Sequence, residues 1–143
     1  LAWQYLGGVE PCILCIYQRW PYVAVAALAA AGLVLDRRPA ARAAIIALCG
    51  VALLIGAGIA GFHVGVEQHW WAGTADCFAD PLAAGSSIDA LRAQLLAEPV
   101  VPCDEVTWSL FGISMAGYNF LISLGLGITA LAVARVLLKE TGR

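Results

Sequence analysis

The feature that most constrains this chain is a set of three long stretches without a charged side chain. They span residues 20–35, 43–66 and 106–134, and the first helix can begin as early as Pro11. A helix that crosses a membrane needs about 20 mostly apolar residues, each adding about 1.5 Å. The chain is 62% hydrophobic and only 13% charged, whereas soluble domains are nearer half apolar and a quarter charged. We therefore predict an all-α membrane protein, with residues 1–143 forming a single membrane domain and spans at about 11–35, 43–66 and 106–134.

The distribution of basic residues predicts the orientation of these spans. Arginines crowd the short link 36–42 and basic residues recur after residue 134, whereas the long link 67–105 carries seven acids and only Arg92. Basic loops stay in the cytoplasm, so the short link and the C-terminus are expected inside and the loop 67–105 outside. The net charge of −2 makes a nucleic-acid partner unexpected.

The N-terminal residues complete this topology. Three spans with a cytoplasmic C-terminus leave the N-terminal end outside. Residues 1–9 are too short to cross a membrane and are either the tail of an earlier span or an interfacial segment. We therefore expect a four-helix bundle in which the first helix is largely missing from this chain.

Four of the five cysteines fall on the outward side of this topology. Cys12 and Cys15 lie at the outward end of the first span, and Cys77 and Cys103 lie in the outward loop. Disulfides form in oxidising compartments such as the bacterial periplasm. Four cysteines allow three pairings, and the sequence does not choose among them. Cys49, inside the second span, is interpreted as a small buried apolar residue.

The first two cysteines form a C-x-x-C motif at a predicted helix start. Pro11 suits the first helical position, which would place Cys12 and Cys15 in the first turn. The helix dipole, the motif itself and Arg19 four residues on are each expected to lower the pKa of Cys15. A structural disulfide or half of a metal site are the alternatives. Arg19 either contacts a ligand inside the membrane or extends to the interface.

Three further features of the spans bear on this end of the molecule. Pro21 removes a helical hydrogen bond and predicts a kink. His63 is expected level with Arg19, where a lone histidine is more often a packing or hydrogen-bonding residue than a catalyst. Small residues form a stripe that predicts close helix contact, namely Ala57, Gly61 and Gly65.

The outward loop contains a segment with helical periodicity. Residues 87–98 place apolar side chains on one face, namely Ile88, Leu91, Leu95 and Leu96. We predict a short amphipathic helix that lies on the membrane surface. Packing against the outer rim of the protein would give the same pattern.

Three segments of the chain carry a family resemblance. "PCILCIYQR", "HVGVEQHWW…C" and "PCDEVTWSLFGISMAGYN" resemble the signatures of the disulfide bond formation protein B (DsbB) family, in matching order from about residue 9 to 135. The resemblance implies a four-helix bundle of the bacterial inner membrane. Such a protein would reoxidise a periplasmic thioredoxin-like dithiol oxidase (DsbA-like) and pass the electrons to ubiquinone or menaquinone.

The resemblance also implies a role for each outward cysteine. Cys12 and Cys15 resemble the quinone-coupled pair, with Cys15 as the thiolate that contacts the quinone ring. Cys77 resembles the sulfur that forms a mixed disulfide with the soluble partner. Cys103 would resolve that disulfide and could pair transiently with Cys12. These four residues are the catalytic cysteines that we expect.

The resemblance places two further residues beside the quinone. Arg19 matches the quinone-side arginine of the family. His63 matches a quinone-pocket histidine, and its distance in sequence from Cys77 suggests a small insertion. The quinone-binding residues that we expect are therefore Cys15, Arg19 and His63, with no metal ligand.

Two other functions are compatible with the residues themselves. A membrane metal-binding protein could use Cys12, Cys15, Cys77 and Cys103 as a four-cysteine site, since zinc favours such thiolate ligands. A scaffold protein could use the same cysteines only to staple its loops.

Overall fold

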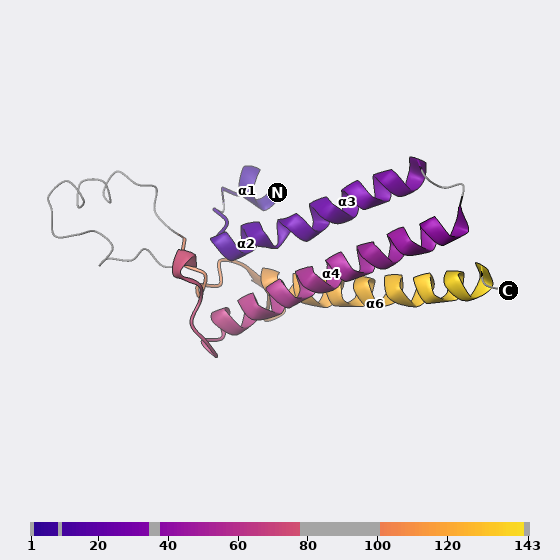
Figure 1. Ribbon diagram of the computed structural model, residues 1–143. Coiled ribbons are helices and arrows are strands. Elements are labelled where there is room, and N and C mark those ends of the chain that lie inside the picture. Colours follow the sequence, from indigo (N-terminus) through magenta and orange to yellow (C-terminus); the bar gives the residue numbers. More distant parts are fainter. Residues whose placement is uncertain (1, 9, 35–37, 78–100, 142–143) are drawn as a thin grey trace, which may run out of the picture.

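A computed structural model of the chain describes residues 2–8, 10–34, 38–77 and 101–141. Within this part the elements follow the order α1 (Ala2–Tyr5), α2 (Ile13–Tyr17), α3 (Arg19–Val34), α4 (Pro39–Glu67), the 3₁₀ helix η1 (Ala75–Cys77), β1 (Ser109–Leu110), β2 (Ile113–Ser114) and α6 (Met115–Thr141). Figure 1 shows α3, α4 and α6 as long, roughly parallel rods, with the C-terminal end of α3, the N-terminal end of α4 and the C-terminal end of α6 at one end. The amphipathic helix expected over residues 87–98 lies outside the described residues.

The long helices have the dimensions and the surface of membrane spans. In the described part of the chain, three segments are long and apolar enough to cross a bilayer, namely Ile13–Val34, Pro39–Glu67 and Met115–Thr141. Large apolar side chains along them are exposed, as at Leu33, Val51 and Leu126. Such faces are stable against lipid and costly in water. The prediction of an all-α membrane protein is confirmed.

The first span differs from a continuous helix beginning at Pro11 in two ways: it starts later, and it is interrupted. Its helix starts at Ile13, with Cys12 as the N-cap, because the Cys12 sulfur accepts a hydrogen bond from the backbone N–H of Cys15 at 3.3 Å. Pro11 therefore precedes the cap, and its predicted place inside the first turn is wrong. The helix is interrupted at Gln18, between α2 and α3. Pro21 explains this break, since it has no N–H to offer the carbonyl of Tyr17, and the predicted kink is confirmed.

The third charge-free stretch is only partly helical. Residues 106–114 precede the helix, and within them Ser109–Leu110 pairs antiparallel with Ile113–Ser114. Phe111 and Gly112 form the turn with φ of 51° and 77°. Two positive φ values in succession produce the tight hairpin turn that matches the strand twist. The helix expected from residue 106 to 134 therefore begins at Met115, and it continues to Thr141.

Ser114 explains where the last helix begins and joins it to its neighbour. Its Oγ accepts a hydrogen bond from the backbone N–H of Gly117 at 3.1 Å, as an N-cap side chain does. The same hydroxyl donates to the carboxylate of Glu67 at the end of α4. The C-terminal end of α4 and the N-terminal end of α6 are thereby held together.

Glycines allow α4 and α6 to pack closely near the middle of the bundle. A Cβ on Gly127 would lie 2.9 Å from Leu54 and 3.1 Å from the carbonyl oxygen of Gly50. The stripe of small residues predicted on α4 contributes only in part. Gly61 faces Phe120 of α6, but Gly65 faces the ring of Trp71, where a Cβ would lie 1.9 Å from the indole.

The close approach at Gly127 has a measurable consequence. Gly127→Ala is expected to destabilise the folded protein by about 1–3 kcal/mol, because the added methyl overpacks the contact with α4. Gly125→Ala is the matched control, since a Cβ there meets no described atom within 4 Å. The midpoint of unfolding in a detergent titration measures both. Equal midpoints for the two variants would contradict the tight contact.

Candidate active site

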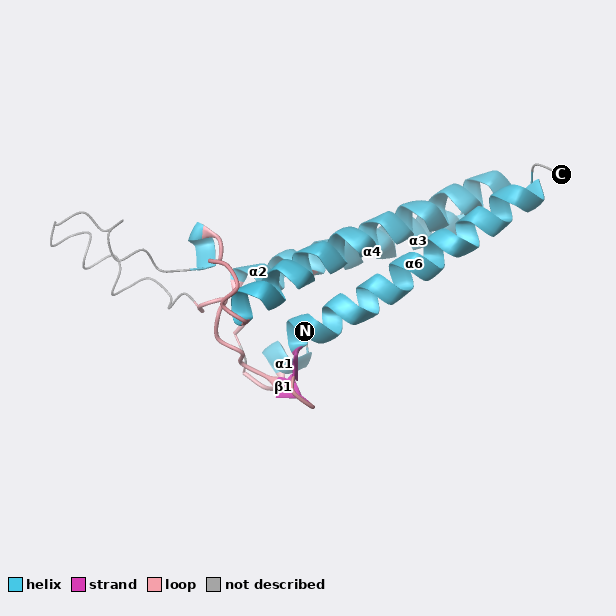
Figure 2. Ribbon diagram, turned by 90° about the horizontal axis from the view of Figure 1, so that it is seen from below, coloured by secondary structure: helices cyan, strands magenta, loops and turns pink. Residues whose placement is uncertain are grey.

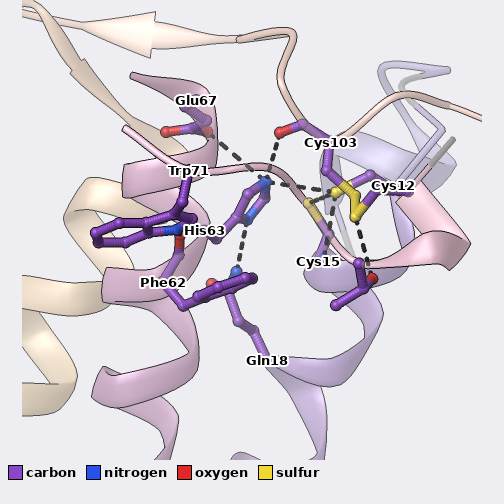
Figure 3. Close-up of a disulfide and its surroundings, with 10 residues drawn as sticks. Cys12, Cys15, Gln18, Phe62, His63, Glu67, Trp71 and Cys103 are labelled. Carbon is purple, nitrogen blue, oxygen red and sulfur yellow. Dashed lines mark hydrogen bonds and ion pairs between the residues drawn. A yellow bond between two sulfur atoms is a disulfide. The ribbon is translucent and has the colours of Figure 1, made fainter. Parts of the chain in front are cut away.

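The four cysteines predicted to lie together do so at one end of the bundle. Cys77 and Cys103 form a disulfide with their Cα atoms 5.2 Å apart, and Cys12 and Cys15 are free thiols. Cys12, Cys77 and Cys103 belong to one buried apolar cluster, completed by Leu14 and Val66. Figure 3 shows the disulfide directly beside the Cys12 and Cys15 side chains. Cys49, in α4, is half-buried and belongs to another part of the helix.

Each cysteine of this cluster is positioned by a different short element. Cys12 is the N-cap of α2, and Cys15 lies one turn further on, with the two sulfur atoms 2.9 Å apart. Cys77 ends η1, where the hydroxyl of Thr74 lies 3.4 Å from its sulfur. Cys103 lies in the segment that leads to the β-hairpin. In Figure 2 that hairpin and α1 lie at the same end of the molecule as α2.

The surroundings of Cys12 favour its thiolate form. A hydrogen bond with the side chain of Cys15 is the largest effect, and further hydrogen bonds from His63 and from the Cys15 backbone act in the same direction. Together they outweigh the desolvation of a buried sulfur and lower the pKa of Cys12 to about 4. The lowered pKa therefore belongs to the N-cap cysteine, whereas the sequence predicted it for Cys15. The reason is that the Cys12 sulfur is hydrogen-bonded to the Cys15 side chain, which has the largest effect, and also to His63 and to the backbone N–H of Cys15.

This shift predicts how reduced protein responds to pH. The Cys12 thiolate is expected to persist at neutral pH and to be lost as the pH falls through about 4. Because its pKa is depressed in the folded state, the unfolded chain binds more protons between pH 4 and 9, so stability should rise with pH across that window. Thiolate absorbance of the reduced protein, measured against Cys12→Ser, checks the titration. A transition near 9 would contradict it.

His63 lies between the two cysteine pairs. Its side chain is buried, and its Nε2 lies 3.6 Å from the Cys12 sulfur, 3.2 Å from the carbonyl oxygen of Cys103 and 4.0 Å from Glu67. Its Nδ1 lies 2.8 Å from the amide nitrogen of Gln18. The interpretation of His63 as a hydrogen-bonding residue agrees with these contacts, which Figure 3 shows as dashed lines.

A cavity of about 230 Å³ opens beside these residues. Its walls include the sequence-predicted Cys12, Cys15, Arg19 and His63. Further polar and apolar residues line it, among them Gln4, Gln18, Tyr22, Glu67, Trp108, Met115 and Asn119. Arg19 and Cys15, four residues apart, share this cavity as their helical spacing predicts.

None of these seven further lining residues was singled out from the sequence, and Gln18, Tyr22, Glu67 and Asn119 among them form polar contacts with distant side chains. The available signal was a polar amide inside an apolar span, as at Asn119, since such groups are costly in a membrane and usually have a partner. Their partners lie far away in the chain, so the sequence could not pair them.

Three residues of this site could bind a metal ion together, whereas the metal-binding alternative requires four cysteines. The ligand atoms of Cys12, Cys15 and His63 all lie within 4.8 Å of one another. Cys77 and Cys103 cannot act as thiolate ligands while they form a disulfide. The four-cysteine metal site therefore does not exist in this state of the protein.

Comparison with known proteins identifies the family. Residues 1–133 match the family model described as "Disulfide bond formation protein DsbB". The chain belongs to the DsbB family. The resemblance of its three sequence segments to that family is confirmed, and the protein is a multi-pass membrane protein of disulfide bond formation.

Individual relatives agree with this assignment. A disulfide bond formation protein B of Dechloromonas aromatica (strain RCB) is 33% identical, over 98% of this chain and 83% of the relative. Those of Methylococcus capsulatus and Aromatoleum aromaticum are 34% and 31% identical, covering 92% and 97% of this chain and 80% and 82% of the relatives. No solved structure gives a significant match.

Proposed function

We propose that this protein is a thiol:quinone oxidoreductase that reoxidises a periplasmic DsbA-like dithiol oxidase and passes the electrons to a membrane quinone. The observation that carries the proposal is the packing of the Cys77–Cys103 disulfide and the Cys12 and Cys15 thiols in one buried cluster beside a cavity. Disulfides exchange by thiolate attack on sulfur. Two cysteine pairs within reach of each other can therefore relay electrons.

The relay balances in three exchanges. The reduced partner gives two electrons and two protons to the Cys77–Cys103 disulfide and leaves with its own disulfide formed. The Cys77 and Cys103 thiols then reduce a Cys12–Cys15 disulfide through a mixed disulfide. The Cys12 and Cys15 thiols are finally reoxidised, with two electrons and two protons leaving to the quinone. The thiolate preference of Cys12 supports the last exchange, since a thiolate is more readily oxidised than a thiol.

The residues around the cavity fit a flat ring with two oxygen atoms. Trp108 and Met115 provide apolar surface, and Arg19 provides a cation. Gln4 also lines the cavity, and its buried amide oxygen has no hydrogen-bond partner among the described residues. A quinone bound there would supply a two-electron, two-proton acceptor. Arg19 would stabilise the negative charge that develops on a ring oxygen, and Cys15 would face the ring.

We also propose the orientation of the protein in the bacterial inner membrane. The cysteine cluster would face the periplasm, and the link between α3 and α4 and the C-terminus would face the cytoplasm. Support comes from charge, since Arg38 and Arg42 lie at the start of α4 and Lys139 lies in the last turn of α6. The start of α4 and the last turn of α6 lie at the end of the bundle away from α2 (Figure 1).

The decisive experiment is a turnover assay with detergent-solubilised protein, a reduced thioredoxin-like donor and a quinone. Quinone reduction should require the protein and the donor together, and should oxidise one donor dithiol per quinone. Oxidation of the donor without quinone consumption, beyond one turnover, would exclude the proposed electron acceptor. If the folded protein neither oxidises the donor nor reduces the quinone, the proposal as a whole is excluded.

A further inference from the structure

A chain of side-chain hydrogen bonds runs from α6 through the kink of the first span to His63. Asn119 donates through its amide nitrogen to Oε1 of Gln18 at 2.5 Å. The amide nitrogen of Gln18 lies 2.8 Å from Nδ1 of His63. At the far end, the hydroxyl groups of Tyr22 and Ser123 donate to Oδ1 of Asn119. Gln18 and His63 are 6% and 3% exposed, so this pair is largely shielded from bulk water.

The direction in which these hydrogen bonds are donated specifies which nitrogen of His63 carries a proton. Two hydroxyl donors occupy the Asn119 oxygen, so its nitrogen faces Gln18 and donates there. Gln18 accepts with Oε1 and is left with its N–H groups toward His63. A ring nitrogen that faces an N–H donor must accept, so Nδ1 of His63 bears no proton.

The other side of the ring independently requires the same assignment. Nε2 of His63 lies 3.2 Å from the carbonyl oxygen of Cys103. A carbonyl oxygen can only accept a hydrogen bond, so Nε2 must donate. The Cys12 sulfur at 3.6 Å and the Glu67 carboxylate at 4.0 Å are also acceptors once ionised. Both faces of the ring thus agree on the Nε2–H tautomer.

We propose that Gln18 is a positioning residue that holds His63 as the Nε2–H tautomer, so that the imidazole donates a hydrogen bond toward the Cys12 sulfur and the Cys103 carbonyl. Asn119 and Tyr22 fix the Gln18 amide in the required orientation. The ring then stabilises Cys12 as a thiolate and ties the segment carrying Cys103 to the same site. The consequence for disulfide exchange rests on the proposed function, whereas the tautomer itself does not.

Nitrogen NMR of the detergent-solubilised protein, labelled at the histidine ring nitrogens, tests the tautomer directly. The His63 signals, assigned by comparison with His69→Gln, should show a protonated Nε2 and a bare Nδ1. Gln18→Glu replaces the amide donor with a carboxylate acceptor, and at a pH where that carboxylate is ionised the proton should appear on Nδ1. Gln68→Glu is the matched control, because Gln68 is exposed at the end of α4 and makes the same change of charge outside the network.

The thiolate absorbance of Cys12 provides a second measurement. In Gln18→Glu the Cys12 titration should move to higher pH, because Nε2 no longer offers a proton to the sulfur, while Gln68→Glu should leave it in place. A protonated Nδ1 in the unchanged protein, or a tautomer that Gln18→Glu does not alter, would overturn the inference. Loss of quinone turnover with an intact Nε2–H tautomer would count only against the proposed function.

Discussion

Cys77→Ser is expected to abolish quinone reduction by the reduced soluble donor, with a loss of more than about a thousandfold, as for the removal of other enzyme nucleophiles. Serine cannot form the mixed disulfide through which electrons would enter, and the Cys103 sulfur loses its partner. The initial rate of quinone reduction with the donor measures the effect. Cys15→Ser should cause an equal loss, since it removes half of the second pair.

The two variants should fail at different steps. Cys77→Ser should still pass electrons from a small dithiol to the quinone through Cys12 and Cys15, whereas Cys15→Ser should not. Cys49→Ser is the matched control and should keep the activity of the unchanged protein, because Cys49 lies in α4 away from the cysteine cluster. Full activity in Cys77→Ser with the protein donor would disprove the relay.

Arg19→Ala is expected to lower kcat/KM for the quinone on the order of 100-fold, the loss typical of removing one charge-stabilising donor. Arg19 lines the cavity four residues after Cys15, and its cation would stabilise the negative charge that develops on the quinone oxygen. Single-turnover oxidation of the soluble donor by the Cys77–Cys103 disulfide should be unchanged, because Arg19 takes no part in that exchange. Stopped-flow measurement of each half-reaction separates the two.

A second arginine provides the control for charge. Arg135→Ala removes the same charge from an exposed position near the C-terminal end of α6, and the quinone kinetics should not change. Arg19→Lys should recover only part of the loss, since an ammonium group keeps the charge but not the planar set of donors. Quinone kinetics that are unaffected by Arg19→Ala would remove Arg19 from the proposed site.

Local sequence patterns were sufficient for the membrane architecture and for recognising the cysteines that cluster in the structure. Hydropathy located the spans because a bilayer imposes a minimum length on any apolar helix. Asymmetry of charge predicted that Cys12, Cys15, Cys77 and Cys103 share one side of the membrane, and in the structure these four residues lie together. The kink at Pro21 also followed from one residue, because the missing N–H acts within a single turn.

Boundaries and side-chain directions were less predictable, since they depend on competing local interactions. The stretch 106–114 is as apolar as a span, but Phe111 and Gly112 adopt positive φ and form a hairpin. The sequence could not show that the Cys12 sulfur would cap α2, which shifts the helix start. Nor could it show that hydrogen bonds with the Cys15 side chain and with His63 would make Cys12 the favoured thiolate.

The sequence alone therefore determined that this is a membrane protein, and the segments around its cysteines identify its family. Only the tertiary structure decided which cysteines pair, and that Gln18, His63 and Asn119 meet in one hydrogen-bonded chain. The reason is physical: hydropathy and helix breaks act over a few neighbouring residues. The hydrogen-bonded chain, by contrast, joins side chains from three helices, and their contacts exist only once α4 and α6 have packed against the kinked first span.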